Sequence, residues 1–273
     1  MIPGAGANGR PYFVKFGVNT NRRFFIPMAN QRYDALQTNL TKRFSHGVFL
    51  TSSFTWSKAL GWNGGNSDNG LSFYVPSQFS KNRSVAGFDR TLAWTSAANW
   101  ELPFGKAKKL ATGGVAAAIV GGWQINPTVS LYTGTPFTVT ADGSSLNAPQ
   151  NTQVADQVNS NVQQFGGVGL GAPFYDPSAF APVRDVRFGN TGQNILRGPR
   201  LFDMNMGLFR RFNLTERATL QFRAEALNLT NTPALNNPNS SVSTPSNFMM
   251  ITSTISTVTS AQRTIRFGLR MGF

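Results

Sequence analysis

Hydrophobic residues recur at every second position in seven stretches of the chain. In the last stretch, TIRFGLRMGF, arginine and glycine alternate with Ile265, Phe267, Leu269, Met271 and Phe273. Successive side chains of a β-strand point to opposite faces, so each stretch predicts a strand with one apolar and one polar face. The predicted strands cover residues 33–44, 48–58, 89–102, 122–133, 201–212, 217–228 and 264–273.

The connections between these strands alternate in length along the chain. SHG (45–47), PFGKAKKLATGG (103–114) and NLTE (213–216) are short, whereas the intervening connections are long and rich in glycine, asparagine and proline. A β-sandwich has shorter strands and loops of comparable length at both ends. Transmembrane barrels combine short periplasmic turns with long extracellular loops and strands of ~9–11 residues. The pattern predicts an all-β fold, an antiparallel transmembrane β-barrel segment of about seven to eight strands. FVKFGVN (13–19) could supply an eighth strand.

The apolar face of this predicted barrel carries aromatic side chains close to the short turns. Such residues form an interfacial girdle in outer-membrane barrels, and here they are Phe44, Trp100, Trp123, Phe212 and Phe273. Two cations, Lys42 and Arg210, fall on the same face near short turns. We expect their long side chains to reach the lipid head groups.

The composition limits the chemistry that the chain can perform. Of its 273 residues, 25 are basic and 11 acidic, giving a net charge of +14, but the basic residues are dispersed, which does not favour nucleic-acid binding. There is no cysteine, the longest apolar run is VAAAIV (115–120), and no signal peptide is visible. His46 lies in a turn without catalytic partners, and the glycine-rich segments GAGANG (4–9) and GVGLGA (167–172) lack the strand and helix of a nucleotide site. We expect no enzymatic activity, cofactor or metal.

Candidate binding residues lie on the polar faces and in the long loops. Five arginines on the predicted inner face could form a basic pore wall for anionic ligands or contact acidic plug residues: Arg43, Arg211, Arg223, Arg266 and Arg270. We favour the other interpretation, structural pairing across strands, for example of Arg223 or Arg266 with Glu225. Loop aromatics could bind a ligand or, as we favour, pack the loops over the barrel mouth: Trp62, Phe73, Tyr74, Phe79, Phe174 and Tyr175.

Four segments resemble TonB-dependent outer-membrane receptors, most closely the Oar-like branch, which carries a carboxypeptidase-regulatory-like domain before its plug. They are SFTWSKAL (53–60), GGWQINPTVSLYTGTPF (121–137), the block from Asn194 to Pro233 and RTIRFGLRMGF at the end. The resemblance implies a bacterial outer-membrane location and ligand uptake powered through the TonB complex. It also implies that residues 33–273 are the C-terminal portion of the barrel and residues 1–32 an extracellular loop remnant or part of a strand. The plug and the TonB-contacting segment would then be missing from this chain.

The resemblance also implies particular partners. These are outer-membrane lipid and lipopolysaccharide, an unknown transported ligand, and the outer-membrane assembly machinery. That machinery would recognise Ile265, Phe267, Leu269, Met271 and Phe273 as an end signal. Two other functions stay open on the sequence alone: a small self-contained barrel acting as porin or adhesin, and a soluble basic β-protein that binds nucleic acid.

Overall fold

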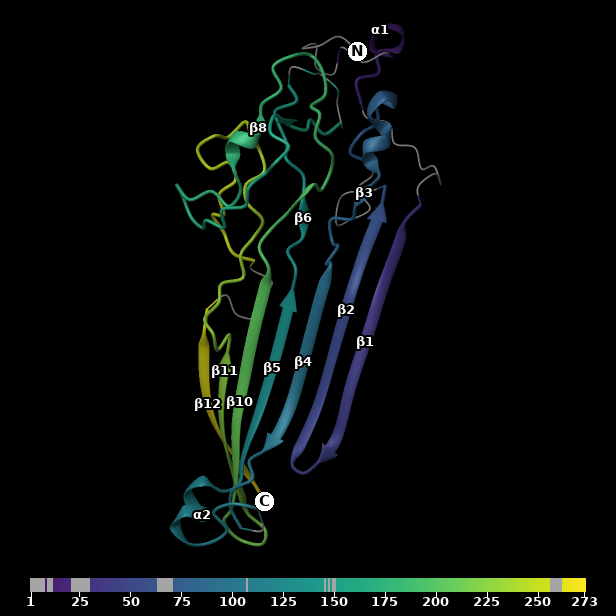
Figure 1. Ribbon diagram of the computed structural model, residues 1–273. Coiled ribbons are helices and arrows are strands. Elements are labelled where there is room, and N and C mark those ends of the chain that lie inside the picture. The colour runs from purple at the N-terminus through teal and green to yellow at the C-terminus, as the bar shows by residue number, and fades with distance from the viewer. Residues whose placement is uncertain are drawn as a thin grey trace.

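Seven long antiparallel strands form one curved sheet in the computed structural model, which describes residues 8, 12–20, 30–62, 71–106, 108–144, 146, 148, 151–255 and 262–273. The sheet order is β1-β2-β4-β5-β10-β11-β12, so neighbouring strands follow one another along the chain (Figure 1). The strands are β1 (Arg32–Ser45), β2 (Val48–Gly61), β4 (Leu92–Glu101), β5 (Trp123–Tyr132), β10 (Leu201–Asn213), β11 (Thr219–Leu227) and β12 (Thr264–Gly272). All seven predicted strands are confirmed, with small differences at their ends.

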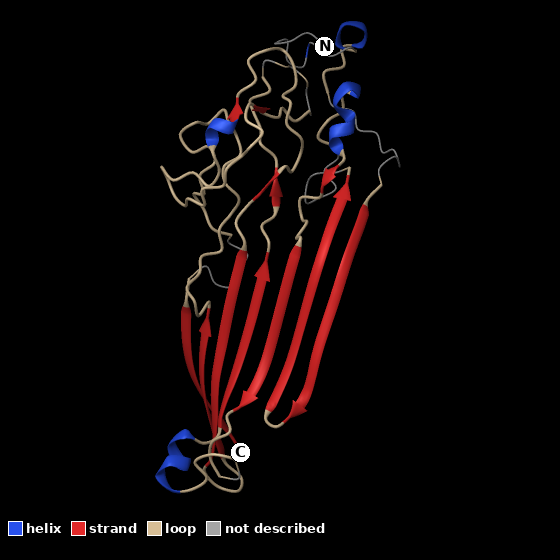
Figure 2. Cartoon of the chain, in the orientation of Figure 1, coloured by secondary structure: helices blue, strands red, loops and turns tan. Residues whose placement is uncertain are grey.

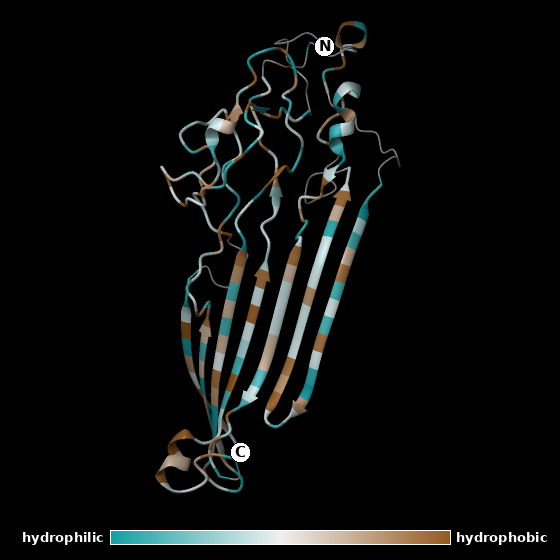
Figure 3. Cartoon of the chain, in the orientation of Figure 1, coloured by the Kyte–Doolittle hydropathy of each residue, from teal (hydrophilic) through white to brown (hydrophobic). Residues whose placement is uncertain are grey.

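The strand register keeps the apolar positions of all seven strands on one face. Phe54 lies opposite Trp94, Trp94 opposite Leu131, and Leu131 opposite Phe202, so one apolar row crosses four strands. Figure 3 shows the resulting alternation along each strand. Many large side chains of this face are exposed, including Leu36, Leu40, Trp56, Trp100, Ile265, Phe267, Leu269 and Met271.

No side chain on the apolar face of these seven strands is buried. Phe267 keeps 75% of its surface exposed, a value that belongs to a residue facing solvent or lipid and not a protein core. Within the described residues, no second layer covers this face. The arrangement therefore excludes a soluble sandwich, in which the apolar rows would be pressed together.

The sheet is not closed, because each of its outermost long strands pairs on one side only. β1 pairs with β2 and β12 pairs with β11. The eighth member of the sheet is the short strand β3 (Ser84–Val85), which pairs with β2. The suggestion of an eighth strand at 13–19 is wrong: Phe13–Phe16 form one turn of helix, α1, which ends where Gly17 adopts a left-handed conformation.

The described residues of the three long connections, 71–91, 133–200 and 228–255, fold together at one end of the sheet, and we call them the cap (Figure 2). The sequence analysis predicted irregular loops, but the cap contains short strands and 3₁₀ helices. Two two-stranded ladders join β6 (Pro136–Phe137) to β9 (Leu196–Arg197) and β7 (Asp156–Gln157) to β8 (Phe180–Ala181). The cap also contains two 3₁₀ helices, Pro76–Asn82 and Pro177–Ala179.

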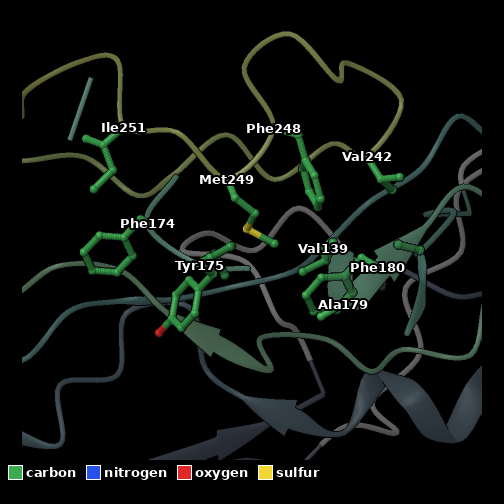
Figure 4. Packing of buried hydrophobic residues seen from close by; sticks show 11 residues of the cluster. Val139, Phe174, Tyr175, Ala179, Phe180, Val242, Phe248, Met249 and Ile251 are labelled. Carbon is green, nitrogen blue, oxygen red and sulfur yellow. The ribbon is translucent and has the colours of Figure 1, made fainter. Parts of the chain in front are cut away.

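The principal buried hydrophobic cluster lies in the cap and not in the sheet (Figure 4). It consists of Phe137, Val139, Ala155, Phe174, Tyr175, Ala179, Phe180, Val242, Phe248, Met249 and Ile251. Backbone hydrogen bonds join the last two connections around it, for example from Phe174 N to Met249 O at 2.7 Å. The first connection joins them where Thr152 N donates to Ser72 O at 2.7 Å.

The loop aromatics mostly pack as expected. Phe73, Phe174 and Tyr175 are buried, and Trp62 packs on Phe79 with ring centroids 5.2 Å apart. Tyr74 is the exposed member of the set. These side chains therefore stabilise the cap, and only Tyr74 is presented openly to a ligand.

The opposite end of the sheet carries the short connections and the C-terminus (Figure 1). The connection between β4 and β5 contains a short helix, α2 (Gly114–Val120), which the sequence analysis did not predict. Among the described residues, no helix has the length and apolar character needed to cross a membrane. The next strand, β5, includes Pro127, and its ladder to β4 is interrupted between the Ala97–Thr128 and Trp100–Ile125 pairs because proline has no N–H to donate.

Candidate lumen face and cap junction

The polar face of the sheet gathers four of the five candidate arginines on three adjacent strands. In the ladder, Gln221 lies between Arg211 and Arg270, and Glu225 lies opposite Arg266. Arg223 lies between Phe209 and Gly268. The positions alternate with the apolar row, so these arginines share the inner face of β10–β12.

Arg223 does not pair with Glu225, contrary to one of the two interpretations of the sequence. Its guanidinium donates two hydrogen bonds to the Gln221 side-chain oxygen, at 3.1 and 3.0 Å, and lies 5.2 Å from the centre of the Phe209 ring. Within the described residues, neither Arg223 nor Arg266 forms an ion pair with Glu225. The inner face of β10–β12 carries four arginines and two carboxylates, Asp203 and Glu225, so its net charge is positive even though Glu225 lies opposite Arg266.

A hollow of about 460 Å³ lies at the short-turn end of this face. Its lining includes Arg211, Gln124, Gln221 and Phe209, and a salt bridge between Lys108 and Glu101 at 2.8 Å forms part of its wall. The hollow offers hydrogen-bond donors and three cations, Lys108, Arg210 and Arg211, of which Lys108 pairs with Glu101. Such a surface suits a polar or anionic group.

Arg43 is not brought together with the other arginines. It lies on β1, at the opposite edge of the sheet, where the ladder is irregular between Lys42 and Ser45. The five predicted residues thus form one group of four and one separate residue.

The two cations of the apolar face bind backbone carbonyls instead of extending free toward head groups. Lys42 Nζ donates to Ser45 O at 3.0 Å and to Val48 O at 3.2 Å, across the turn between β1 and β2. Arg210 donates to Ala118 O and, at 2.7 Å, to Ile119 O at the end of α2. Their charges lie at the rim of the sheet, and each completes the hydrogen bonding of a turn.

The proposed assembly signal occupies the exposed edge strand β12. Ile265, Phe267, Leu269 and Met271 alternate on its apolar face, and Phe273, just beyond the strand, is 93% exposed. Exposed aromatic side chains thus gather at the short-turn end of the sheet: Phe44, Trp100, Phe212 and Phe273.

A junction between the sheet and the cap was missed by the sequence analysis. The side chain of Asp89, only 1% exposed, pairs with Arg197, and its other oxygen accepts a hydrogen bond from Ala59 N at 2.6 Å. Arg197 also donates to Gly134 O at 3.1 Å. These contacts join β2, the first connection and the second connection where the strands end.

Two glycines make this junction possible. A Cβ atom on Gly134 would lie 1.8 Å from Gly198 O, and one on Gly198 would lie 1.9 Å from the Asn237 side-chain oxygen. Both glycines lie in segments that carry the family resemblance, TGTPF and LRGPR. For Gly198, the basic residue before it and the proline after it were an available signal, but they do not identify the partner.

A second charged cluster stabilises the cap farther from the sheet. Arg187 donates to both carboxylate oxygens of Asp156, at 2.9 and 2.6 Å, and Asn190 N donates to Asp156 at 3.1 Å. The hydrogen bonds from Arg187 hold the pKa of Asp156 below its usual value. Lys81 donates to Gly189 O at 2.7 Å, and burial lowers its pKa.

Two of the other motifs lie in turns. His46 lies in the turn between β1 and β2 with a positive φ of 53°, and GVGLGA lies in a turn of the cap. GAGANG lies outside the described residues, apart from residue 8. Among the residues that the structure describes, no three His, Cys, Asp or Glu side chains gather as metal ligands would.

An antiparallel sheet with an exposed apolar face, a polar opposite face and long connections at one end defines the wall of a transmembrane β-barrel. Comparison with family models agrees, because residues 3–266 match the outer membrane beta barrel domain. The chain belongs to this family and is located in the bacterial outer membrane. No curated protein and no solved structure matches the chain.

Proposed function

We propose that this barrel wall is part of a TonB-dependent outer-membrane receptor that takes up a ligand without catalysing a reaction. The observation that carries the proposal is the combination of a folded extracellular cap with a basic inner face on β10–β12. A receptor needs a surface that captures a ligand outside and a polar lumen through which the ligand passes. The segments that resemble such receptors form β2, β5, β10, β11 and β12 and the junction around Gly134 and Gly198.

The unpaired edges of β1 and β12 support a larger barrel. In lipid, each unsatisfied backbone group costs several kcal/mol, so an open edge is unstable there. We propose that further strands of the receptor pair with these edges, and that the assembly machinery recognises β12 and Phe273. The plug and the TonB complex would act through parts other than the sheet described here.

Uptake by bacteria that carry the intact receptor tests the proposal. Deleting the gene should abolish uptake of one ligand among a panel of iron chelates, cobalamin and glycans, and collapsing the proton gradient should abolish the same uptake. Uptake that the gene supports without the gradient would contradict the proposal and favour the alternative of a porin. Unchanged uptake of every ligand in the panel would also count against a receptor role for these substrates.

The arginines of the inner face give a residue-level prediction. Replacing both Arg266 and Arg270 by Gln in the intact receptor should reduce uptake of an anionic ligand about tenfold or more, because each charge-assisted hydrogen bond contributes roughly 1.5–3 kcal/mol. Arg43→Gln, on the distant β1, is the matched control and should have a smaller effect. Normal uptake together with lowered barrel stability would assign Arg266 and Arg270 a structural role only.

A further inference from the structure

The connection between β4 and β5 places an apolar helix on the lipid side of the sheet. Arg210 and Trp123 lie opposite each other in the ladder, in the apolar row that also contains Phe222. Both side chains bind the end of α2: Trp123 Nε1 donates to Ile119 O at 3.1 Å, and the guanidinium of Arg210 donates to Ala118 O and Ile119 O. The C-terminal end of α2 is therefore fixed over the lipid-facing side of the periplasmic rim.

The side chains of α2 are apolar and almost uncovered. Its sequence is GVAAAIV, Val115 is 75% exposed and Ile119 is 61% exposed. Leu110 and Val120 add exposed apolar surface beside them. A helix of this length is not stable alone in water, and so much exposed apolar surface indicates a contact with something oily.

The same connection carries only positive charge. Residues 102–122 contain Lys106, Lys108 and Lys109 but no Asp or Glu. Lys108 pairs with Glu101 on the inner face, whereas Lys106 and Lys109 are exposed. Exposed lysines beside an apolar helix are the pattern of a segment that lies at a membrane surface, where phosphate groups attract the cations.

Two glycines hold the lysines close to the helix. A Cβ on Gly121 would lie 2.8 Å from the Gly105 Cα and 2.5 Å from Ala117 O, so only glycine allows this contact. The turn that contains Lys106 and Lys109 is thereby packed against the residue at which α2 ends.

We propose that α2, together with Lys106 and Lys109, is a lipid anchor at the periplasmic rim of the barrel. The helix rests in the interfacial layer of the periplasmic leaflet, continuous with the lipid-facing row of Trp123 and Phe212. Lys106 and Lys109 contact the phosphate groups of phospholipids there. The anchor depends only on the membrane location of the barrel and not on which molecule the barrel transports.

The full chain in vesicles of phosphatidylethanolamine and phosphatidylglycerol provides the test. Because the chain has no cysteine, Val115→Cys creates a single site for a polarity-sensitive fluorophore. The label should show blue-shifted emission and strong quenching by lipids spin-labelled near the head group. Glu216→Cys, in the short turn between β10 and β11, is the matched control and should show water-like emission with little quenching.

A second position and a charge variant make the outcome decisive. Ile119→Cys should behave as Val115→Cys does, and only preparations whose circular dichroism shows the folded β-sheet are compared. Water-like emission at both positions, or a blue shift without quenching by lipid, would overturn the anchor. Adding Lys106→Gln and Lys109→Gln should lower the quenching at residue 115 roughly twofold; unchanged quenching would overturn the phosphate contact.

Discussion

Asp89 is a buried link between the cap and the sheet. Its buried carboxylate binds Arg197 and the backbone N–H of Ala59, so three chain segments meet at one side chain. Removing one partner of a buried ion pair leaves the other charge uncompensated.

Asp89→Asn should therefore destabilise the junction by about 3 kcal/mol. Amide hydrogen exchange in the reconstituted chain would measure this as faster exchange of the cap and of Ala59 N–H. Asp185→Asn is the matched control, since Asp185 pairs with Arg187 on the exposed surface of the cap and such pairs contribute little to stability. Equal effects of the two variants would contradict the role given to Asp89.

Gly134 tests the close approach of the two connections. Gly134→Ala would place a methyl group 1.8 Å from Gly198 O, so the backbone must move and the cap should become sensitive to protease. Gly268→Ala in β12 is the control, because a Cβ there meets nothing within 4 Å. A Gly134→Ala variant as protease-resistant as the control would show that the contact is not required.

At the scale of elements, the ladder of β7 with β8 depends on pH through Asp156. Arg187 lowers the folded-state pKa of this carboxyl, so its stabilising contribution is complete above the unfolded pKa of about 3.9 and is lost as pH falls through the lower folded value. The hydrogen-exchange protection of residues 153–157, relative to the intrinsic rate at each pH, should decrease as the pH falls through this acidic range. Asp156→Asn should exchange faster at pH 7 and lack that step. A variant with the same pH profile as the wild type would refute the linkage.

The seven long strands could be predicted from the sequence because period-two alternation depends only on which face of a strand meets lipid. Alternation alone assigns Leu269 to the apolar face and Arg270 to the polar face, whichever residues they contact in the folded sheet. The cap could not be predicted in this way. Phe174 and Met249 are far apart in the chain and meet in a core that has no period, and Asp89 finds Arg197 only through the folded connections.

The candidate site, like the fold, could be predicted only where it depends on strand alternation. Alternation correctly placed Arg211, Arg223, Arg266 and Arg270 on one face, but the choice of Gln221 over Glu225 by Arg223 depends on side-chain geometry. The α2 helix was missed since VAAAIV, between glycine pairs, has no amphipathic pattern of its own. The end of α2 is bound by Arg210, which the sequence analysis expected to reach the lipid head groups instead.

At the scale of the whole molecule, the buried core lies in the cap while the sheet keeps its apolar face uncovered (Figures 3 and 4). A water-soluble protein would do the reverse, since burial of apolar side chains is its main stabilising contribution. In a bilayer, lipid covers the apolar face and the polar face lines the lumen. This division explains why one chain carries both exposed rows of leucine and phenylalanine and a compact, water-facing cap.

The most direct test is a cysteine scan of residues 124–131 in β5, with a spin label at each position in turn in lipid vesicles. Labels at Ile125, Val129 and Leu131 should be accessible to oxygen dissolved in the bilayer, and labels at Gln124, Thr128 and Ser130 to a water-soluble nickel complex. This alternation would confirm that the apolar face meets lipid. Labels at Ile125, Val129 and Leu131 that neither reagent reaches would show that a second protein layer covers that face, and the barrel interpretation would be wrong.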